Sequence, residues 1–226
     1  MTVELRVLTY NVRSLRDDVE ALARVVRGCD PDLVCVQEAP RLLRWRSRCA
    51  RLARECGLLY VGGGATTGGA ALLASLRVDV ADAAEIRLTK RGRLHQRGLA
   101  MATVTKSGSS LSVRVASVHL GLDAEERISH AREVLDLLAD GQGRTILAGD
   151  LNERPGGPAR KLLEHGGLRD LGPESGPTFP ARLPEKRIDA VLGAVHVEVL
   201  DHHVVQTADT ALASDHLPVL AVVRVG

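Results

Sequence analysis

Short apolar runs and stretches with apolar residues at helical spacing divide the chain into predicted strands and helices. The runs predict strands over residues 3–12, 33–36, 99–105, 111–118, 145–148, 187–192, 195–205 and 219–225, with a strand pair within 70–88. The helical spacing predicts helices over residues 17–28, 42–56, 123–139 and 159–165. Asp123 is the expected N-cap of the third helix, because its side chain can accept hydrogen bonds from the free backbone amides there.

No Pro/Ser-rich linker or low-complexity tract interrupts this pattern. The chain has 226 residues, of which 45% are hydrophobic, so it is long enough to bury one sizeable core. We therefore expect a single domain over residues 1–226.

The predicted strand that begins at Thr145 ends in Gly149, Asp150, Leu151 and Asn152. Side chains two apart on an extended segment project to the same side, so Asp150 and Asn152 are expected to face one cleft. The alternative is a turn that uses Asp and Asn because they tolerate tight backbone geometry. The residues at the ends of the other predicted strands decide between a site and a turn.

Polar side chains follow most of the predicted strands. They are Asn11, Glu38, His119, Asp150, Asn152, Asp189, Asp215 and His216. Oxygen ligands such as Glu38, Asp215 and Asn11, with no Cys among them, suit a hard cation, Mg²⁺ or Mn²⁺. The two His and the other two Asp supply acid–base and orienting groups, although a single His at a strand end is commonly a core residue.

The net charge of +2 excludes a strongly basic DNA-coating protein but leaves room for a local basic groove. The Arg-rich helix over residues 42–56 and the segment 90–97 are candidate surfaces for a nucleic-acid backbone; the alternative is a solvated face. Only four aromatic residues are present, so a base-stacking platform is not expected. The glycines at 62–64 and 68–69 bracket a loop that lacks the Lys of a P-loop.

The four cysteines form no CxxC pair, so the spacing of a zinc site is absent. Free thiols, together with the absence of an apolar signal segment or membrane-spanning run, lead us to expect a soluble, cytoplasmic protein.

Six short motifs follow one another along the chain: Thr9-Tyr10-Asn11-Val12, Val36-Gln37-Glu38, Ser117-Val118-His119-Leu120, Gly149-Asp150-Leu151-Asn152, Arg187-Ile188-Asp189 and Ser214-Asp215-His216-Leu217-Pro218. In this order they resemble the endonuclease/exonuclease/phosphatase superfamily, which DNase I typifies. The resemblance runs from residue 9 to the last predicted strand.

This resemblance implies an α/β fold: a four-layer α/β/β/α sandwich of two mixed sheets with helices outside. It also implies Mg²⁺-dependent hydrolysis of phosphate esters, with Mn²⁺ as a possible substitute. By position, Glu38 would be the main metal ligand, assisted by Asn11 and Asp215. Asp150 with Asn152 would orient or deprotonate the attacking water. His216, oriented by Asp189, would stabilise the phosphoryl group, and His119 would stabilise or protonate the departing oxygen.

The residue at position 119 separates branches of the superfamily. Abasic-site endonucleases typically carry Tyr there, so His119 resembles the DNase I, sphingomyelinase and deadenylase-like branches. The chain departs from the common pattern at two positions. In DNase I-like members an acid often supports this His, and the nearest counterpart in this chain is Gln96. An aromatic residue commonly follows the Arg-Ile-Asp motif, and this chain has Ala190 there. The alanine is expected to remove a ring near the site.

The leading hypothesis is a metal-dependent phosphodiesterase, most simply a nuclease acting on DNA or RNA, with Arg97 and Arg187 binding substrate. The second is a phosphoesterase for a small-molecule or lipid-headgroup ester, and the third is a non-catalytic binding protein that keeps the fold. A monomer without a membrane span is expected.

Overall fold

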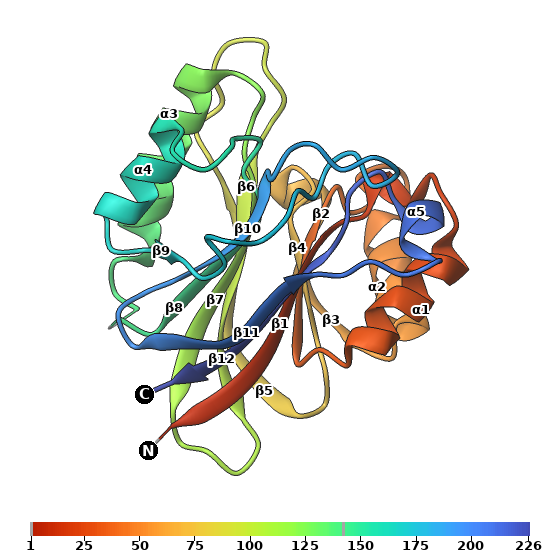
Figure 1. The fold of residues 1–226 in the computed structure, drawn as a ribbon, viewed down its shortest axis with the longest axis horizontal. Helices are drawn as coiled ribbons and strands as arrows, with labels where there is room; N and C mark the ends of the chain where they lie inside the picture. Colours follow the sequence, from red (N-terminus) through yellow and green to blue (C-terminus); the bar gives the residue numbers. More distant parts are fainter. Residues whose placement is uncertain (1, 142) are drawn as a thin grey trace.

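The strands pair into two six-stranded mixed sheets in the computed structural model, which describes residues 2–141 and 143–226 (Figure 1). The first sheet has the strand order β11-β12-β1-β2-β4-β3, and the second has the order β5-β6-β7-β8-β10-β9. Strands of the first sheet are β1 (Val3–Asn11), β2 (Leu33–Gln37), β3 (Leu59–Gly63), β4 (Ala71–Ala74), β11 (Val197–Val204) and β12 (Val219–Val225). Those of the second are β5 (Val78–Arg87), β6 (Gly98–Lys106), β7 (Ser112–His119), β8 (Thr145–Asp150), β9 (Arg169–Asp170) and β10 (Asp189–Gly193).

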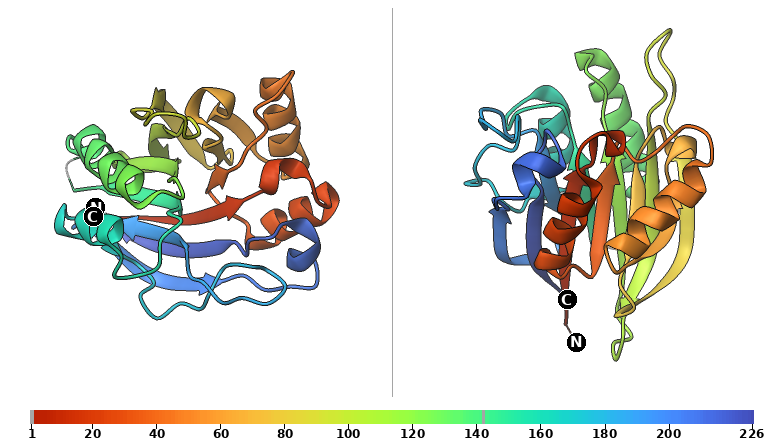
Figure 2. Two further views of the ribbon diagram at one scale, coloured as in Figure 1. Left: turned by 90° about the horizontal axis from the view of Figure 1, so that it is seen from above. Right: turned by 90° about the vertical axis from the view of Figure 1, so that its right-hand side faces the viewer.

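Helices cover the outer face of each sheet, as the two perpendicular views in Figure 2 show. The first sheet is covered by α1 (Val19–Cys29) and α2 (Trp45–Glu55), with the short α5 (Thr210–Ala213) packed against α1. The second is covered by α3 (Ala124–Leu138) and α4 (Pro158–His165). Two short 3₁₀ turns, Arg13–Leu15 and Ala65–Thr67, lie in loops. The predicted four-layer sandwich is confirmed. None of the described helices is long and apolar enough to cross a bilayer.

Side chains along each strand point alternately to the core between the sheets and to the helices outside, which explains the layered packing. In β1, Val3, Leu5 and Val7 pack into the core between the sheets, whereas Leu8 and Tyr10 pack under the helices. Because successive strand side chains point to opposite faces, the central strands need apolar residues on both faces, and their sequences read as nearly continuous apolar runs.

The strand ends that carry the motifs all lie at one end of the sandwich. His119 of β7 is in register with Asp150 of β8, which is in turn in register with Asp189 of β10. The loop between β5 and β6 projects at this end, at the top of Figure 1, while the two termini lie together at the other end.

Four elements differ from the predicted ones. The helix expected from Leu42 begins at Trp45, because the backbone before it turns and Arg44 adopts a left-handed conformation with φ +58°. Strand β3 was not expected, since its glycines hide the strand pattern. Strand β9 and helix α5 are too short to give a periodic signal.

A buried carboxylate ties the two sheets together away from the site. Asp32, in the turn before β2, accepts hydrogen bonds from Arg77 Nε at 2.6 Å, from Lys106 Nζ at 3.0 Å and from the backbone amide of Arg6 at 3.0 Å. Lys106 belongs to β6 of the opposite sheet. Burial alone raises the pKa of Asp32, but these donors outweigh it and hold the pKa below the ordinary value of 3.8.

We expect Asp32→Asn to lower the free energy of unfolding by about 2 kcal/mol at neutral pH, because Lys106 loses its carboxylate partner and Arg77 keeps only that of Asp30. Since the pKa is depressed in the folded state, this contribution is complete above the ordinary value and disappears as pH falls through the folded-state pKa. Urea unfolding of both proteins between pH 7 and 3 measures it, with the exposed Asp79→Asn as the control. A stability difference that does not shrink on acidification would contradict this role.

Candidate active site

The predicted site residues converge where the strand ends meet, on the face between the sheets. Asp150 lies at the centre and is fully buried. Its Oδ2 accepts a hydrogen bond from Asn11 Nδ2 at 3.0 Å, and its Oδ1 accepts one from the backbone amide of Asn152 at 2.9 Å. Asn152 thus reaches the same cleft as Asp150, but through a left-handed turn with φ +50° rather than along an extended strand.

Asp150 lies in an environment that favours its neutral form. Burial, followed by the negative charge of Asp189, raises the pKa of Asp150 to about 7. A carboxylate with a pKa near neutrality can accept a proton from water at neutral pH, which is the property that a general base needs.

His216 and Asp189 form a buried pair beside Asp150. His216 Nδ1 lies 2.9 Å from Asp189 Oδ2, and His216 Nε2 lies 3.8 Å from Asp150 Oδ2. Burial lowers the pKa of His216, but the charge and hydrogen bond of Asp189 outweigh burial and raise the pKa to about 9. His216 therefore carries a positive charge at neutral pH and presents it toward the centre of the site.

Two residues that the sequence patterns did not indicate fix this pair. Thr178 is fully buried and donates its hydroxyl to Asp189 Oδ2 at 2.6 Å. The ring of Phe179 packs on the ring of His216, with the centroids 4.8 Å apart. Thr178 and Phe179 lie in an irregular loop without strand or helix periodicity, so only their position before the Arg187-Ile188-Asp189 motif could have pointed to them.

His119 is held in a different state from His216. Its Nε2 lies 3.1 Å from Asn152 Nδ2 and 3.3 Å from Asp150 Oδ2. Burial, followed by the positive charges of Arg97, His216 and Arg41, lowers the pKa of His119 well below its ordinary value. The imidazole is therefore neutral at neutral pH.

The support of His119 differs from the common pattern of the superfamily. Its buried Nδ1 has no hydrogen-bond partner among the described residues. The amide of Gln96, the nearest sequence counterpart of a supporting acid, donates instead to the carbonyls of Leu88 and Arg97, at 2.7 and 2.8 Å.

The expected metal ligands Glu38 and Asp215 both lie beside Asn11. Glu38 is half-buried at the end of β2, with φ +50°, and its Oε1 lies 3.4 Å from Asn11 Nδ2. It forms no ion pair with Arg or Lys among residues 2–141 and 143–226. A carboxylate placed beside Asp150 without a cation partner fits a site for a hard divalent ion. Asp215 lies nearby through Ser214, whose hydroxyl donates to the carbonyl of Asn11 at 2.7 Å, and it is paired with Arg13 at 3.2 Å.

A second group of side chains could also hold a metal. One ligand atom each from Asp150, Asp189 and His216 lies within 4.8 Å of the others. However, His216 Nδ1 already shares a hydrogen bond with Asp189, and a metal there would displace that proton. Glu38, which lacks such a partner, is the stronger ligand on chemical grounds, and Asp150 borders both positions.

The two arginines expected to bind substrate have different surroundings. Arg97 is 9% exposed, its Nε has no partner among the described residues, and its guanidinium is close enough to Asp150 and Glu38 to feel their charges. The guanidinium of Arg187 instead donates to Asp170, at 2.7 Å, and to the carbonyl of Gly172. We therefore leave Arg187 out of the proposed substrate-binding residues.

Ala190 does not face the site. It packs in the core under α3 and α4, on the opposite face of β10 from Asp189. The expectation that an alanine here removes a ring beside the substrate is therefore wrong, because the strand alternation turns this position toward the helices.

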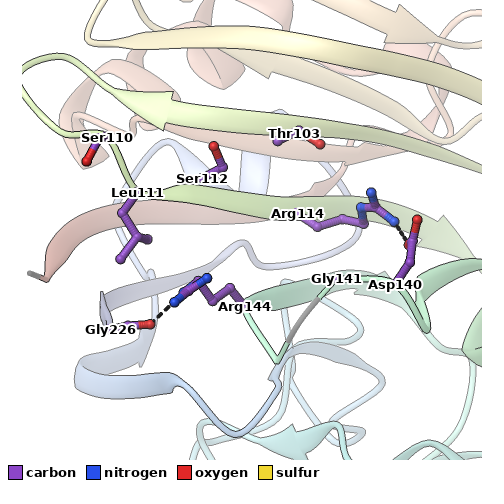
Figure 3. A pocket seen from close by; sticks show the side chains of 9 residues that line it. All are labelled: Thr103, Ser110, Leu111, Ser112, Arg114, Asp140, Gly141, Arg144 and Gly226. Atoms are coloured by element: carbon purple, nitrogen blue, oxygen red, sulfur yellow. Dashed lines mark hydrogen bonds and ion pairs between the residues drawn. The ribbon is translucent and has the colours of Figure 1, made fainter.

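A hollow of about 620 Å³ lies at the opposite end of the sheets, near the chain termini (Figure 3). Its two arginines are engaged: Arg114 with Asp140, and Arg144 with the carbonyl of Gly226 at 2.7 Å. Among the described residues that line this hollow there is no acid–base pair comparable to Asp189 and His216, so the chemistry is assigned to the strand ends.

Comparison with solved structures gives full-length similarities. An endonuclease/exonuclease/phosphatase family protein from Bacteroides thetaiotaomicron is 18% identical with a TM-score of 0.84, and the match covers 100% of this chain and 99% of that one. A mannosyl-6-phosphatase from Bacteroides thetaiotaomicron VPI-5482 is 18% identical with a TM-score of 0.82, covering 97% and 99%. TDP2 of D. rerio, solved with a single-strand DNA product, is 18% identical with a TM-score of 0.73, covering 97% and 98%. At these identities the likeness establishes the shared fold alone.

No curated protein matches the sequence. Residues 8–216 match the Endonuclease/Exonuclease/phosphatase family, a range that includes every predicted site residue from Asn11 to His216. The chain therefore belongs to the endonuclease/exonuclease/phosphatase family.

Proposed function

We propose that this chain is a divalent-metal-dependent hydrolase of phosphate esters, with Mg²⁺ as its metal. The observation that carries the proposal is the buried chain Thr178–Asp189–His216, which presents an imidazolium to Asp150 beside the unpaired carboxylate of Glu38. A proton acceptor and a fixed positive charge beside a metal-binding pocket are what hydrolysis of an anionic ester needs.

Each side chain has a role that follows from its surroundings. Asp150 accepts a proton from the attacking water, and Asn152 helps to orient that water. His216 places its positive charge against the phosphoryl oxygens as negative charge develops on them. His119 is neutral, so it supports the departing oxygen through a hydrogen bond rather than by complete proton transfer.

Glu38, Asn11 and Asp215 would hold the metal, which supplies polarisation of a phosphoryl oxygen and stabilisation of the leaving oxyanion when bound. Because Asp215 is paired with Arg13 here, a metal has to compete with that guanidinium for it. Arg97 adds a second positive charge at the same pocket.

A nucleic acid is the first candidate substrate. Exposed arginines of segments 41–48 and 88–97, which lie at the end of the sandwich that carries the site, can contact a phosphate backbone. The similar TDP2 structure contains a single-strand DNA product.

A small or membrane-borne phosphate ester is the second candidate. The only ring of the described residues that packs on the catalytic histidines is Phe179, so no aromatic surface for stacked bases adjoins them. The similar mannosyl-6-phosphatase structure matches 97% of this chain, the same share as the TDP2 structure. A non-catalytic role is disfavoured, because every catalytic position is filled.

We expect Asp150→Asn to reduce kcat by about 10²–10⁴-fold, because the amide cannot accept the proton of water. The assay compares supercoiled plasmid, single-stranded RNA, a sugar phosphate and a plain aryl phosphodiester, with Mg²⁺ present. Asp79→Asn, on the exposed strand β5, is the matched control. Full activity of Asp150→Asn on every substrate would refute the proposed base.

We expect Asp189→Asn to move the alkaline limb of the pH–kcat/KM profile down by about one to three pH units. The pKa of His216 is raised to about 9, so the charged form is lost only as pH rises through that value. Without the Asp189 carboxylate the charge is lost at lower pH. An unchanged alkaline limb in a folded variant would show that His216 does not act as the charged group.

We expect chelation by EDTA to abolish hydrolysis and Mg²⁺ or Mn²⁺ to restore it. Glu38→Gln should raise the Mg²⁺ concentration for half-maximal activity at least about tenfold, because a charged oxygen ligand is lost. Glu55→Gln, on the last turn of α2, should leave it unchanged. Hydrolysis that persists without a divalent ion would rule out the metal-dependent mechanism.

A further inference from the structure

Two segments beside the site are basic and carry no Asp or Glu, and together we call them the basic rim: residues 39–48 and 88–97. Their cationic side chains, apart from Arg97, are exposed; they are Arg41, Arg44, Arg46, Arg48, Lys90, Arg91 and Arg93. Both segments lie at the end of the sandwich that carries the site, the first after β2 and the second between β5 and β6 (Figure 1).

The two segments are held together by the glycine turn between β3 and β4. Arg41 Nη1 lies 3.4 Å from the carbonyl of Gly68, and a Cβ on Gly68 would lie 2.1 Å from the carbonyl oxygen of Gln96. Arg91 donates to the carbonyl of Glu125 at 3.0 Å and lies 3.5 Å from its carboxylate, which joins the rim to the start of α3. Arg46 lies 3.8 Å from the carboxylate of Glu85, so Arg41, Arg44, Arg48, Lys90 and Arg93 are the rim cations without an ion pair among the described residues. The two segments therefore form one connected surface.

Leucines project from this surface. Leu42 and Leu43 are consecutive and are 77% and 87% exposed. These two leucines lie in a turn, are flanked by Arg41 and Arg44, and leave most of their side-chain surface uncovered. Exposed apolar groups of this kind beside a functional site indicate a contact with another surface.

The combination of leucine and arginine selects the kind of surface. A phosphate backbone is met by the arginines alone and offers the leucines no partner, while stacking on bases requires free aromatic faces. The nearest large ring, Trp45, is covered by the guanidinium of Arg46, 4.1 Å from its centroid. An anionic phospholipid surface, in contrast, attracts the arginines and accepts leucines at the boundary between headgroups and acyl chains.

We propose that the basic rim docks on an anionic phospholipid bilayer, with Leu42 and Leu43 inserted at the headgroup boundary. Docking in this orientation turns the Asp150–His216 centre toward phosphate esters at the membrane surface. Only this last consequence rests on the proposed function; the docking itself does not.

Co-sedimentation of the full chain with vesicles tests the proposal. We expect binding to vesicles of equal parts phosphatidylcholine and phosphatidylglycerol, and much weaker binding to phosphatidylcholine alone or at high salt. The double variant Leu42→Ser/Leu43→Ser should lower the partition coefficient at least about tenfold, because its apolar insertion is lost. The matched control is Leu76→Ser/Val195→Ser, which removes two equally exposed apolar side chains, 83% and 75%, at the opposite end of the sandwich. It should bind like the unmodified chain.

Three results would overturn docking: no sedimentation of the unmodified chain, equal binding by both double variants, or binding to polynucleotide but not to phosphatidylglycerol vesicles. Hydrolysis of a soluble aryl phosphate ester, measured in parallel, should be unchanged in both variants and reports that they are folded. A chain that sediments as expected but hydrolyses nothing would keep the docking surface and remove the proposed function.

Discussion

The site depends on the burial of two carboxylates directly opposite each other. Asp150 and Asp189 are partners in the register of β8 and β10, and both are almost fully covered. Like charges in such positions repel each other, and a buried charge without a partner is unfavourable. His216, Asn11 and Thr178 each supply a donor or a positive charge to this pair. The loop before β10 and the turn before β12 are therefore placed by electrostatics as much as by apolar packing.

This requirement also separates the two histidines chemically. His216 gains a carboxylate partner and stays charged, whereas His119, a few ångströms from the same Asp150 oxygen, faces arginines and stays neutral. One pocket thus holds a permanent cation and a neutral hydrogen-bonding ring. The basic rim outside it adds exposed cationic side chains and two exposed leucines, which lie apart from these buried groups.

Much of this arrangement was predictable from the sequence, because the strands have strong apolar patterns and the motifs stand at their ends. Asn11, His119 and Asp150 meet because each is the last residue of a strand with its side chain on the face between the sheets. Thr178 and Phe179 were not predictable, since they lie in a loop without periodicity. Ala190 was assigned to the wrong face, because position beside a motif does not reveal which way a strand residue points. The arginine-rich segment looked like a helix from Leu42, but three of those residues form the exposed turn that carries the leucines.

Glu38 and Asn152 have left-handed backbones, at φ +50° each, a conformation that costs a residue with a side chain about 1 kcal/mol or more. Glycine would adopt either conformation without that strain. Glu38 and Asn152 therefore lower the stability of the fold while they supply functional groups to the site. Selection for thermal stability alone would favour glycine at both positions. An acid and an amide that persist there in related chains would therefore indicate selection for the chemistry of the site.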